Sequence, residues 1–439
     1  MKTRVWLWLY GLLMQALQPW VLRKLRRRAR HEPLYAQHIE ERWGYYSVPP
    51  GHGYVWIHAV SLGETRVAAL LLPRLRARWP GVRILLTHGT ATGRELGRSL
   101  LQPGDVQVWQ PWDTLQSAQR FLDHFRPQLG LLLETEVWPL WVQACRVRAL
   151  PLVLINARMS EASLRKAHRL SMLSHPSYAG LHEVWAQTEA DAQRLRALGA
   201  PVTAVLGNLK FDIEVNAQQQ AAGLQARSHL SRPVVMMASS REGEEMLLLK
   251  ALRGHPQALE QAHWLLVPRH PQRFDEVVHL AQENGWAVLR RSRYDSLEQL
   301  TQAWCAQTQA TLAVGDSLGE MGVYSALSQA TLMGGSFEPL GGQNLIEALA
   351  YGSPVVVGPH TFNFLQATDE AVTAGVAVRV ADMAQGINAA LQWLDRQQGA
   401  SEVPAQCRQF VMRHAGAGQR MVQRLEPLIQ KDIKARATD

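Results

Sequence analysis

The chain has 439 residues, enough for two or three domains that each bury a core, and 19% of them are charged, which excludes a disordered chain. Its three cysteines, Cys145, Cys305 and Cys407, form no CxxC pair, so we expect a reducing compartment and neither a disulfide framework nor a zinc site. Of the net charge of +9, residues 1–30 carry +8 and the other 409 residues only +1. A nearly neutral body argues against nucleic acid as a partner.

The first 30 residues predict a membrane anchor. An uncharged, tryptophan-rich run over residues 5–22 precedes a basic cluster over residues 23–30. Eighteen residues is the lower limit for a span, so the run either crosses the membrane or lies on it. In both cases the arginines favour the cytoplasmic side, and we expect residues 5–30 to bind anionic lipid. The alternative is a buried helix with a solvated basic tail.

Short apolar runs alternate with helical patterns along the rest of the chain, which is typical of parallel sheets covered by helices on both faces. A polar, Gln-rich segment at residues 217–232 separates two sets of runs and suggests a linker. We therefore predict two Rossmann-like, doubly wound α/β domains facing a cleft, residues 31–216 and 233–403. Residues 404–439 are expected to form a helical segment that packs back across the joint. The predicted strands are residues 54–58, 83–87, 106–109, 129–133, 152–155, 183–186 and 202–206, then 234–238, 264–267, 287–289, 312–314, 330–333, 355–357 and 376–380.

The first predicted strand ends in a segment that suits acid–base chemistry. Ser61 and Gly63 shape a turn after this strand, and Glu64 begins a helix. Transfer of a group to a hydroxyl needs a base that removes the proton of this acceptor, and one carboxylate at a strand end serves this purpose in an inverting displacement. A glutamate in the first helical turn also complements the helix dipole, worth roughly 0.3–1 kcal/mol. Chemistry alone leaves both interpretations open.

Polar residues also follow other strands of the first half. The turn after the second strand is suited to hold a phosphate or a carboxylate of a substrate, although Thr90 is equally an ordinary N-cap. The polar residues after the fourth and fifth strands either contact the acceptor or cap the next helix. The possible acceptor-binding residues are Ser61, Thr90, Thr92, Arg94, Glu134, Glu136, Asn156, Arg158 and Ser160.

A glycine-rich segment, residues 334–358, is the most informative part of the second half. Its glycines allow a tight turn after a buried strand, and a helix from about Gln343 presents N–H groups and a positive dipole end to an anion. This order of elements resembles the nucleotide-sugar half of a glycosyltransferase of the GT-B type, whereas the alternative is an ordinary glycine turn. Arg269, after another strand, is either a phosphate ligand or part of a surface ion pair. The candidate donor-binding residues are Arg269, Gly335, Gly341, Gly342, Asn344 and Glu347.

Eight segments, in this order, resemble the 3-deoxy-D-manno-octulosonic acid (Kdo) transferases of lipopolysaccharide synthesis. The resemblance implies inverting transfer of Kdo from CMP-Kdo to a lipid A precursor, without metal or cofactor, at the cytoplasmic face of the inner membrane of a Gram-negative bacterium. It also implies that Glu64 is the catalytic base. The segments are residues 58–64, 87–94, 134–139, 156–160, 207–212, 268–271, 315–321 and 334–358.

One position departs from the family pattern. Ser240 and Arg241 stand where the family usually has a Thr-His pair, which leaves the role of position 241 in doubt. The other functions considered are a glycosyltransferase that uses a UDP-sugar and a lipid acceptor, a nucleotide-sugar epimerase, and a catalytically silent membrane scaffold. An epimerase has no need of a membrane anchor, and a scaffold would leave Glu64 and Arg269 replaceable.

Overall fold

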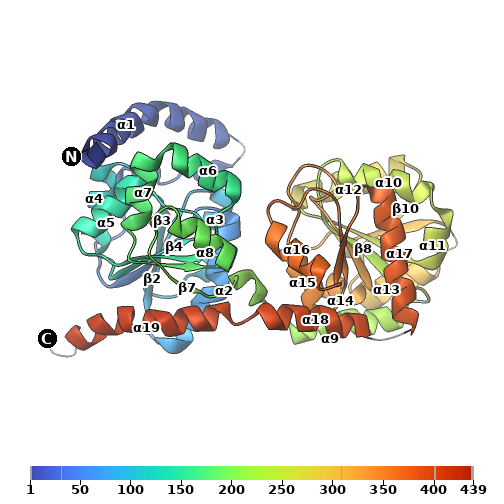
Figure 1. Cartoon of the computed structure of the whole chain (residues 1–439). Helices are drawn as coiled ribbons and strands as arrows, with labels where there is room; N and C mark the ends of the chain where they lie inside the picture. The colour runs from blue at the N-terminus through green and yellow to red at the C-terminus, as the bar shows by residue number, and fades with distance from the viewer. Residues whose placement is uncertain (1, 31, 308, 400–401, 437–439) are drawn as a thin grey trace. The chain divides into compact units, whose positions relative to one another are not determined.

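The computed structural model describes residues 2–30, 32–307, 309–399 and 402–436, and the chain divides into two compact units (Figure 1). Unit 1 comprises residues 1–212 and 415–439, and unit 2 comprises Ile213–His414. Each unit is built on its own seven-stranded sheet, and every pair of neighbouring strands is parallel. The predicted class, two doubly wound α/β domains, is confirmed.

The sheet of unit 1 has the strand order β3-β2-β1-β4-β5-β6-β7. The direction of winding therefore reverses between β1 and β4, and ligands of open parallel sheets bind in the crevice at the carboxyl ends of strands at such a switch point. The strands are β1 (Tyr54–His58), β2 (Arg83–His88), β3 (Val106–Trp109), β4 (Leu129–Leu133), β5 (Leu152–Ala157), β6 (Glu183–Ala186) and β7 (Val202–Val205).

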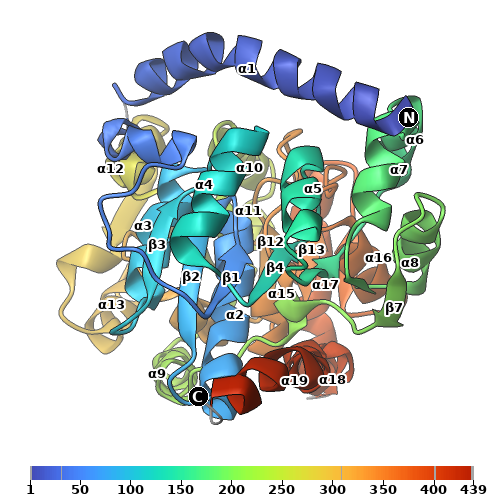
Figure 2. The same cartoon turned by 90° about the vertical axis from the view of Figure 1, so that its left-hand side faces the viewer.

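Helices cover both faces of this sheet (Figure 2). Successive side chains of a strand point to opposite faces, so Val55 and Ile57 of β1 pack in the cluster with α2 and α19, whereas Trp56 packs in the cluster with α4 and α5. The helices of unit 1 are α1 (Lys2–Arg28), α2 (Leu62–Arg78), α3 (Ala91–Leu100), α4 (Leu115–Phe125), α5 (Pro139–Val147), α6 (Glu161–Arg169), α7 (Ser171–Ala179), α8 (Glu189–Arg196) and α19 (Ala417–Arg436), with short 3-10 turns η1 (Pro33–Ala36), η2 (Ile39–Trp43) and η3 (Leu209–Phe211).

The sheet of unit 2 has the order β10-β11-β9-β8-β12-β13-β14, with its switch point between β8 and β12. Its strands are β8 (Val234–Ser240), β9 (His263–Pro268), β10 (Ala287–Arg290), β11 (Thr311–Val314), β12 (Ala330–Met333), β13 (Val355–Val357) and β14 (Ala377–Arg379). Its helices are α9 (Ala217–Ser228), α10 (Glu244–Arg253), α11 (Pro256–Gln261), α12 (Phe274–Glu283), α13 (Leu297–Cys305), α14 (Met321–Leu327), α15 (Leu345–Ala350), α16 (Leu365–Thr373), α17 (Met383–Gly399) and α18 (Glu402–His414), with 3-10 turns η4 (Pro271–Arg273) and η5 (Arg291–Arg293).

The structure places the domain limits differently from the expected ones. Most of the segment expected to be a linker, residues 217–232, forms α9, which packs on α13 and α14 inside unit 2. Alanine and glutamine are good helix formers, so a polar, Gln-rich composition does not by itself indicate a linker. The chain passes from unit 1 to unit 2 after Asp212 and returns after His414, so α18 belongs to unit 2 and α19 to unit 1.

Candidate active site

Glu64 lies at the carboxyl end of β1, in the first turn of α2. Ser61 is the N-cap of this helix: its Oγ accepts a hydrogen bond from the Glu64 N–H (3.4 Å), and Glu64 Oε2 accepts one from the Ser61 N–H (2.8 Å). This reciprocal pair is a capping box, so the carboxylate does stabilise the start of the helix. The expected capping role is therefore present, and it does not exclude a catalytic one.

The surroundings of Glu64 suit a base that works near neutral pH. The pKa of Glu64 is raised to about 7, chiefly by burial and then by the carboxylates of Glu136 and Glu134, although the hydrogen bonds with Ser61 lower it. Since Glu134 follows β4, the neighbour of β1, the carboxylates gather at the switch point of unit 1. A buried carboxyl group with a raised pKa in such a crevice is a candidate for general base catalysis.

Glu134 is neutralised by two cations. It is buried, with a backbone φ of 57°, and its carboxylate binds Arg158 Nε (2.6 Å) and Lys210 Nζ (2.9 Å). Burial alone would raise the pKa of Glu134, but Lys210 and Arg158 hold it below its usual value. Glu136 differs, because burial raises its pKa despite a hydrogen bond from Trp138 Nε1 (3.0 Å). The site thus combines one ionised carboxylate with two whose pKa is raised.

Arg94, also predicted to bind the acceptor, forms an ion pair inside unit 1. Its guanidinium binds Glu41 (2.6 Å) and lies 4.7 Å from the centre of the Trp109 ring, and the side chain is buried. Its charge is therefore balanced by Glu41.

The other expected acceptor residues have local partners or lie open to solvent. Thr90 and Ser160 cap α3 and α6, each accepting a hydrogen bond from a backbone N–H three residues later. Asn156 is fully buried, and its Oδ1 accepts a hydrogen bond from the Leu209 N–H (2.9 Å). Thr92 is exposed on α3. Of the expected acceptor residues, the structure thus gathers Ser61, Glu134 and Glu136 around Glu64, and Arg158 binds Glu134.

In unit 2, a buried glutamate holds the glycine-rich loop after β12. Glu244, at the start of α10, accepts hydrogen bonds from the N–H groups of Gly335 (2.6 Å) and Phe337 (3.0 Å). Gly335 and Gly341 have φ angles of 70° and 92°, and a Cβ atom at Gly341 would overlap Asn363. The loop therefore has a fixed shape that requires glycine, and it lies at the switch point of unit 2.

Arg269 approaches this loop from the end of β9. Its Nε donates a hydrogen bond to Gln343 Oε1 (3.4 Å), and its side chain is half-buried. Asn344 caps α15 through a hydrogen bond from the Ile346 N–H (3.2 Å), and Glu347 is half-buried on the same helix. Because α15 has only six residues, its dipole contributes less to anion binding than the sequence suggested.

The two residues that depart from the family pattern also have partners inside unit 2. The Ser240 hydroxyl donates to Glu245 Oε1 (2.8 Å), and Glu245 in turn binds Arg273 (2.7 Å). Arg241 Nε pairs with Glu242 (3.0 Å). Within the described ranges, no group of three or more His, Cys, Asp or Glu side chains is arranged to hold a metal ion.

Comparison with known proteins adds independent findings. A family model described as 3-deoxy-D-manno-octulosonic-acid transferase matches residues 37–213. The 3-deoxy-D-manno-octulosonic acid transferase of Bordetella pertussis is 40% identical over 95% of this chain and 98% of that protein. The chain belongs to the 3-deoxy-D-manno-octulosonic acid transferase family. The resemblance stated from the sequence is thereby confirmed, and the chain is a Kdo-transferring enzyme rather than a scaffold.

Two solved structures are similar to this Kdo transferase. The UDP-GlcNAc 2-epimerase of Neisseria meningitidis, bound to UDP-GlcNAc, aligns over 86% of this chain and all of that chain, with a TM-score of 0.51 and 15% identity. At this identity the likeness concerns the fold alone, and it agrees with two doubly wound domains. The C-terminal CMP-Kdo binding domain of WaaA from Acinetobacter baumannii is 31% identical over 44% of this chain and 96% of that domain, with a TM-score of 0.38.

Two residues of the candidate site were missed by sequence reasoning. Lys210 stands in the segment 207–212 that contributed to the resemblance, yet nothing in the sequence pairs it with Glu134. Glu244 stands at the start of α10, and the sequence does not show that it binds the loop at Gly335. In each case the signal is an ionisable residue beside a strand end, but its partner is distant in the sequence.

Proposed function

We propose that this Kdo transferase transfers Kdo from CMP-Kdo to a hydroxyl group of a lipid A precursor, with inversion, and that Glu64 is the base. The observation that carries the proposal is a buried carboxyl group at the switch point of unit 1 with its pKa raised to about 7. The acceptor oxygen forms the new bond to the anomeric carbon, its proton passes to Glu64, and the bond to the phosphate breaks with its electron pair leaving on CMP.

In this proposal, unit 1 binds the acceptor. Lys210 and Arg158 flank Glu134, and their side chains are 19% and 46% exposed, so they remain reachable for an anionic group of the acceptor. Glu134 fixes both cations at the edge of the sheet that carries Glu64. An acceptor phosphate bound there would present a hydroxyl group to Glu64.

Unit 2 supplies the donor side. In this proposal, Arg269 and the backbone of the loop that contains Gly335, Gly341 and Gly342 bind the phosphate of CMP. Glu244 fixes the shape of this loop through its hydrogen bonds. Glycines allow a close approach of the backbone to a phosphate, and an arginine neutralises one charge. Asn344 and Glu347, one turn apart, are assigned to the sugar hydroxyls.

The site of action follows from the N-terminal helix. Residues 5–28 of α1 are long and apolar enough to cross a membrane by length and composition, and in the described part of the chain they alone meet this criterion. We propose that α1 attaches the enzyme to the cytoplasmic face of the inner membrane of a Gram-negative bacterium, where its basic end meets anionic lipid. The enzyme can then reach its lipid acceptor while this lipid stays in the bilayer.

The replacement Glu64→Gln tests the base. Purified enzyme is incubated with CMP-Kdo and a lipid A precursor, and the lipid product is weighed by mass spectrometry. Glutamine at this position still completes a capping box, so the fold is kept while the base is lost. We expect transfer to fall by about 10²–10⁴-fold while CMP binding is unchanged.

Ser296→Ala is the control, because it removes the N-cap hydroxyl of α13, a helix to which the proposal gives no role. We expect it to cost about 1 kcal/mol of stability and to leave most of the activity. Near wild-type transfer by Glu64→Gln would remove Glu64 as the base. If the wild-type enzyme adds no Kdo to the lipid, the proposed reaction itself is wrong.

A further inference from the structure

Helix α1 has two different faces from Val5 to Arg28. The residues that are buried or half-buried recur every three or four positions, as one stripe of an α-helix. Opposite this stripe the side chains are exposed although most of them are apolar. The inner stripe consists of Leu7, Tyr10, Gly11, Met14, Gln18, Val21, Leu22, Leu25 and Ala29. The exposed apolar residues are Val5, Trp6, Trp8, Leu9, Leu12, Leu13, Leu17 and Trp20.

Polar contacts fasten the inner stripe to the body of unit 1. The Tyr10 hydroxyl hydrogen-bonds to the buried carboxylate of Asp113, which also accepts a hydrogen bond from the Trp141 N–H (3.0 Å) in the first turn of α5. Farther along the helix, Gln18 Oε1 accepts a hydrogen bond from Trp43 Nε1 (3.0 Å). Near its end, Leu25 is buried in a small cluster of the body. The helix is therefore docked along its length.

This docking conflicts with a helix that crosses the bilayer. From Leu7 to Leu25, its last residue within α1, the stripe is roughly 27 Å long at 1.5 Å per residue, comparable with the hydrocarbon thickness of about 30 Å. A spanning α1 would have to leave the body over this whole length. Tyr10 and Gln18 would enter hydrocarbon, and the buried Asp113 would lose a hydrogen-bond donor, each at a cost.

The docked helix lies at the edge of the sheet that carries Glu64. Asp113 is in the loop that follows β3, and α5 follows β4, so both contact points are at the carboxyl ends of strands. Helix α6, which follows β5, lies at the same edge, and both views show it on the same side of unit 1 as α1 (Figures 1 and 2). The exposed apolar face of α1 is thus at the active edge.

Basic side chains frame this apolar face. Residues 23–28 of α1 include five cations, and α6 adds the exposed Arg165, Lys166 and Arg169. Two exposed apolar residues follow α6, Leu170 (63% exposed) and Met172 (37% exposed). Tryptophans beside an apolar face and cations at its margin suit the boundary between headgroups and acyl chains of an anionic membrane.

We propose that α1 lies in the plane of the membrane and does not cross it, and that its outer face and the segment from Arg165 to Met172 form one lipid-binding surface at the edge that holds Glu64. The proposal deepens the proposed function, since it explains how a lipid acceptor meets the base. Its first test does not depend on transferase activity.

The first test asks on which side of the membrane the N-terminus lies. A short hydrophilic tag with one cysteine is fused before Met1 in full-length Cys305→Ser protein, because Cys305 is the exposed one of the three native cysteines. A membrane-impermeant maleimide is applied to inside-out vesicles and to spheroplasts. We expect labelling of the inside-out vesicles only. Labelling of the spheroplasts, from the periplasmic side, would show a spanning helix and overturn the proposal.

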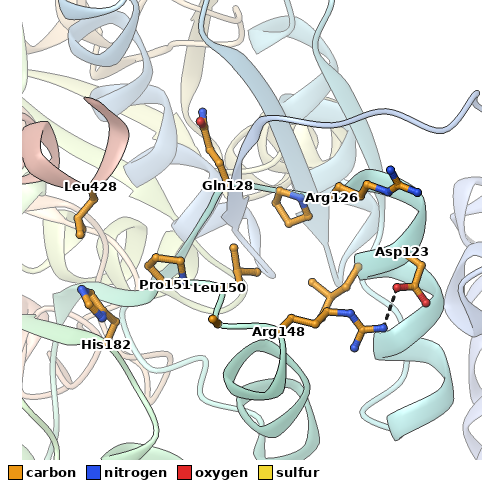
Figure 3. A pocket seen from close by; sticks show the side chains of 11 residues that line it. Asp123, Arg126, Gln128, Arg148, Leu150, Pro151, His182 and Leu428 are labelled. Atoms are coloured by element: carbon orange, nitrogen blue, oxygen red, sulfur yellow. Dashed lines mark hydrogen bonds and ion pairs between the residues drawn. The ribbon is translucent and has the colours of Figure 1, made fainter. Parts of the chain in front are cut away.

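The second test compares two pairs of arginines at opposite edges of the same sheet. Arg165→Gln/Arg169→Gln should lower binding to vesicles containing anionic phospholipid roughly 30-fold and leave binding to neutral vesicles unchanged. The control, Arg126→Gln/Arg148→Gln, lies at a cavity of about 480 Å³ beside the starts of β4, β5 and β6 (Figure 3). It should bind both kinds of vesicle as the wild type does. Equal losses in the two double variants would contradict the placement of the lipid surface.

Discussion

At the scale of the residue, Glu64 combines two features that the sequence presented as alternatives. Its Oε2 accepts the hydrogen bond from the Ser61 N–H, so the start of α2 orients the carboxylate. Burial and the neighbouring carboxylates raise its pKa to about 7, which suits a base near neutral pH. Capping a helix and acting as a base are therefore compatible in our proposal.

The pH dependence of the reaction should follow Glu64. A base acts when deprotonated, so kcat/KM should rise as the pH increases through about 7, the pKa of Glu64, and level off above it. Because the Glu136 carboxylate helps to raise that pKa, Glu136→Gln should shift the rising limb to lower pH. Kinetics in a series of buffers measure the shift.

Glu189→Gln, an exposed residue at the start of α8, is the matched control and should leave the profile unchanged. If kcat/KM of Glu136→Gln rises over the same pH range as in the wild type, the two carboxylates do not interact. If the residual activity of Glu64→Gln still rises with pH as in the wild type, another group is responsible for the titration.

At the scale of the element, the sequence predicts strands well and polar helices poorly. The runs at residues 54–58 and 129–133 are strands with those limits, because a parallel sheet is buried on both faces and nearly all residues of these runs are apolar. The sequence predicts a linker where α9 lies, because the segment is polar overall. Its composition does not reveal that one side of the helix packs on α14. Glu244 was missed for a similar reason, because its partner Gly335 lies 91 residues later.

A distant carboxylate caps the start of α19. Asp212 is buried and accepts hydrogen bonds from the N–H groups of Gly416 (2.7 Å), Ala417 (3.1 Å) and Gly418 (2.7 Å) at the start of this helix. Asp212→Ala would leave these donors unsatisfied, so we expect the free energy of unfolding to fall by about 1–3 kcal/mol. Denaturant unfolding of the full chain measures the loss.

The control for this prediction is Asp123→Ala, which removes an exposed ion pair with Arg148. Exposed pairs contribute about 0–1 kcal/mol, so its effect should be much smaller. If both variants lost the same stability, the cap at the start of α19 would not have the proposed importance.

At the scale of the whole molecule, the chain uses the same fold twice for two tasks. Each unit has a parallel sheet with one switch point, at β1 and β4 in unit 1 and at β8 and β12 in unit 2. The loops there differ in chemistry, with carboxylates and cations in unit 1 and a glycine loop held by Glu244 in unit 2. We infer that acceptor chemistry and nucleotide binding are divided between the units.

This division predicts where CMP alone protects the chain from hydrogen exchange. In the full-length enzyme, CMP should slow exchange in residues 334–342, since a phosphate bound against this loop in our proposal would oppose its local opening. The Arg269→Ala variant should lose this protection because it lacks the neutralising cation, whereas Glu64→Gln should keep it. Protection of residues 61–66 without any in residues 334–342 would place the nucleotide in unit 1 and reverse the assignment. Hydrogen exchange followed by mass spectrometry reads both segments in one experiment.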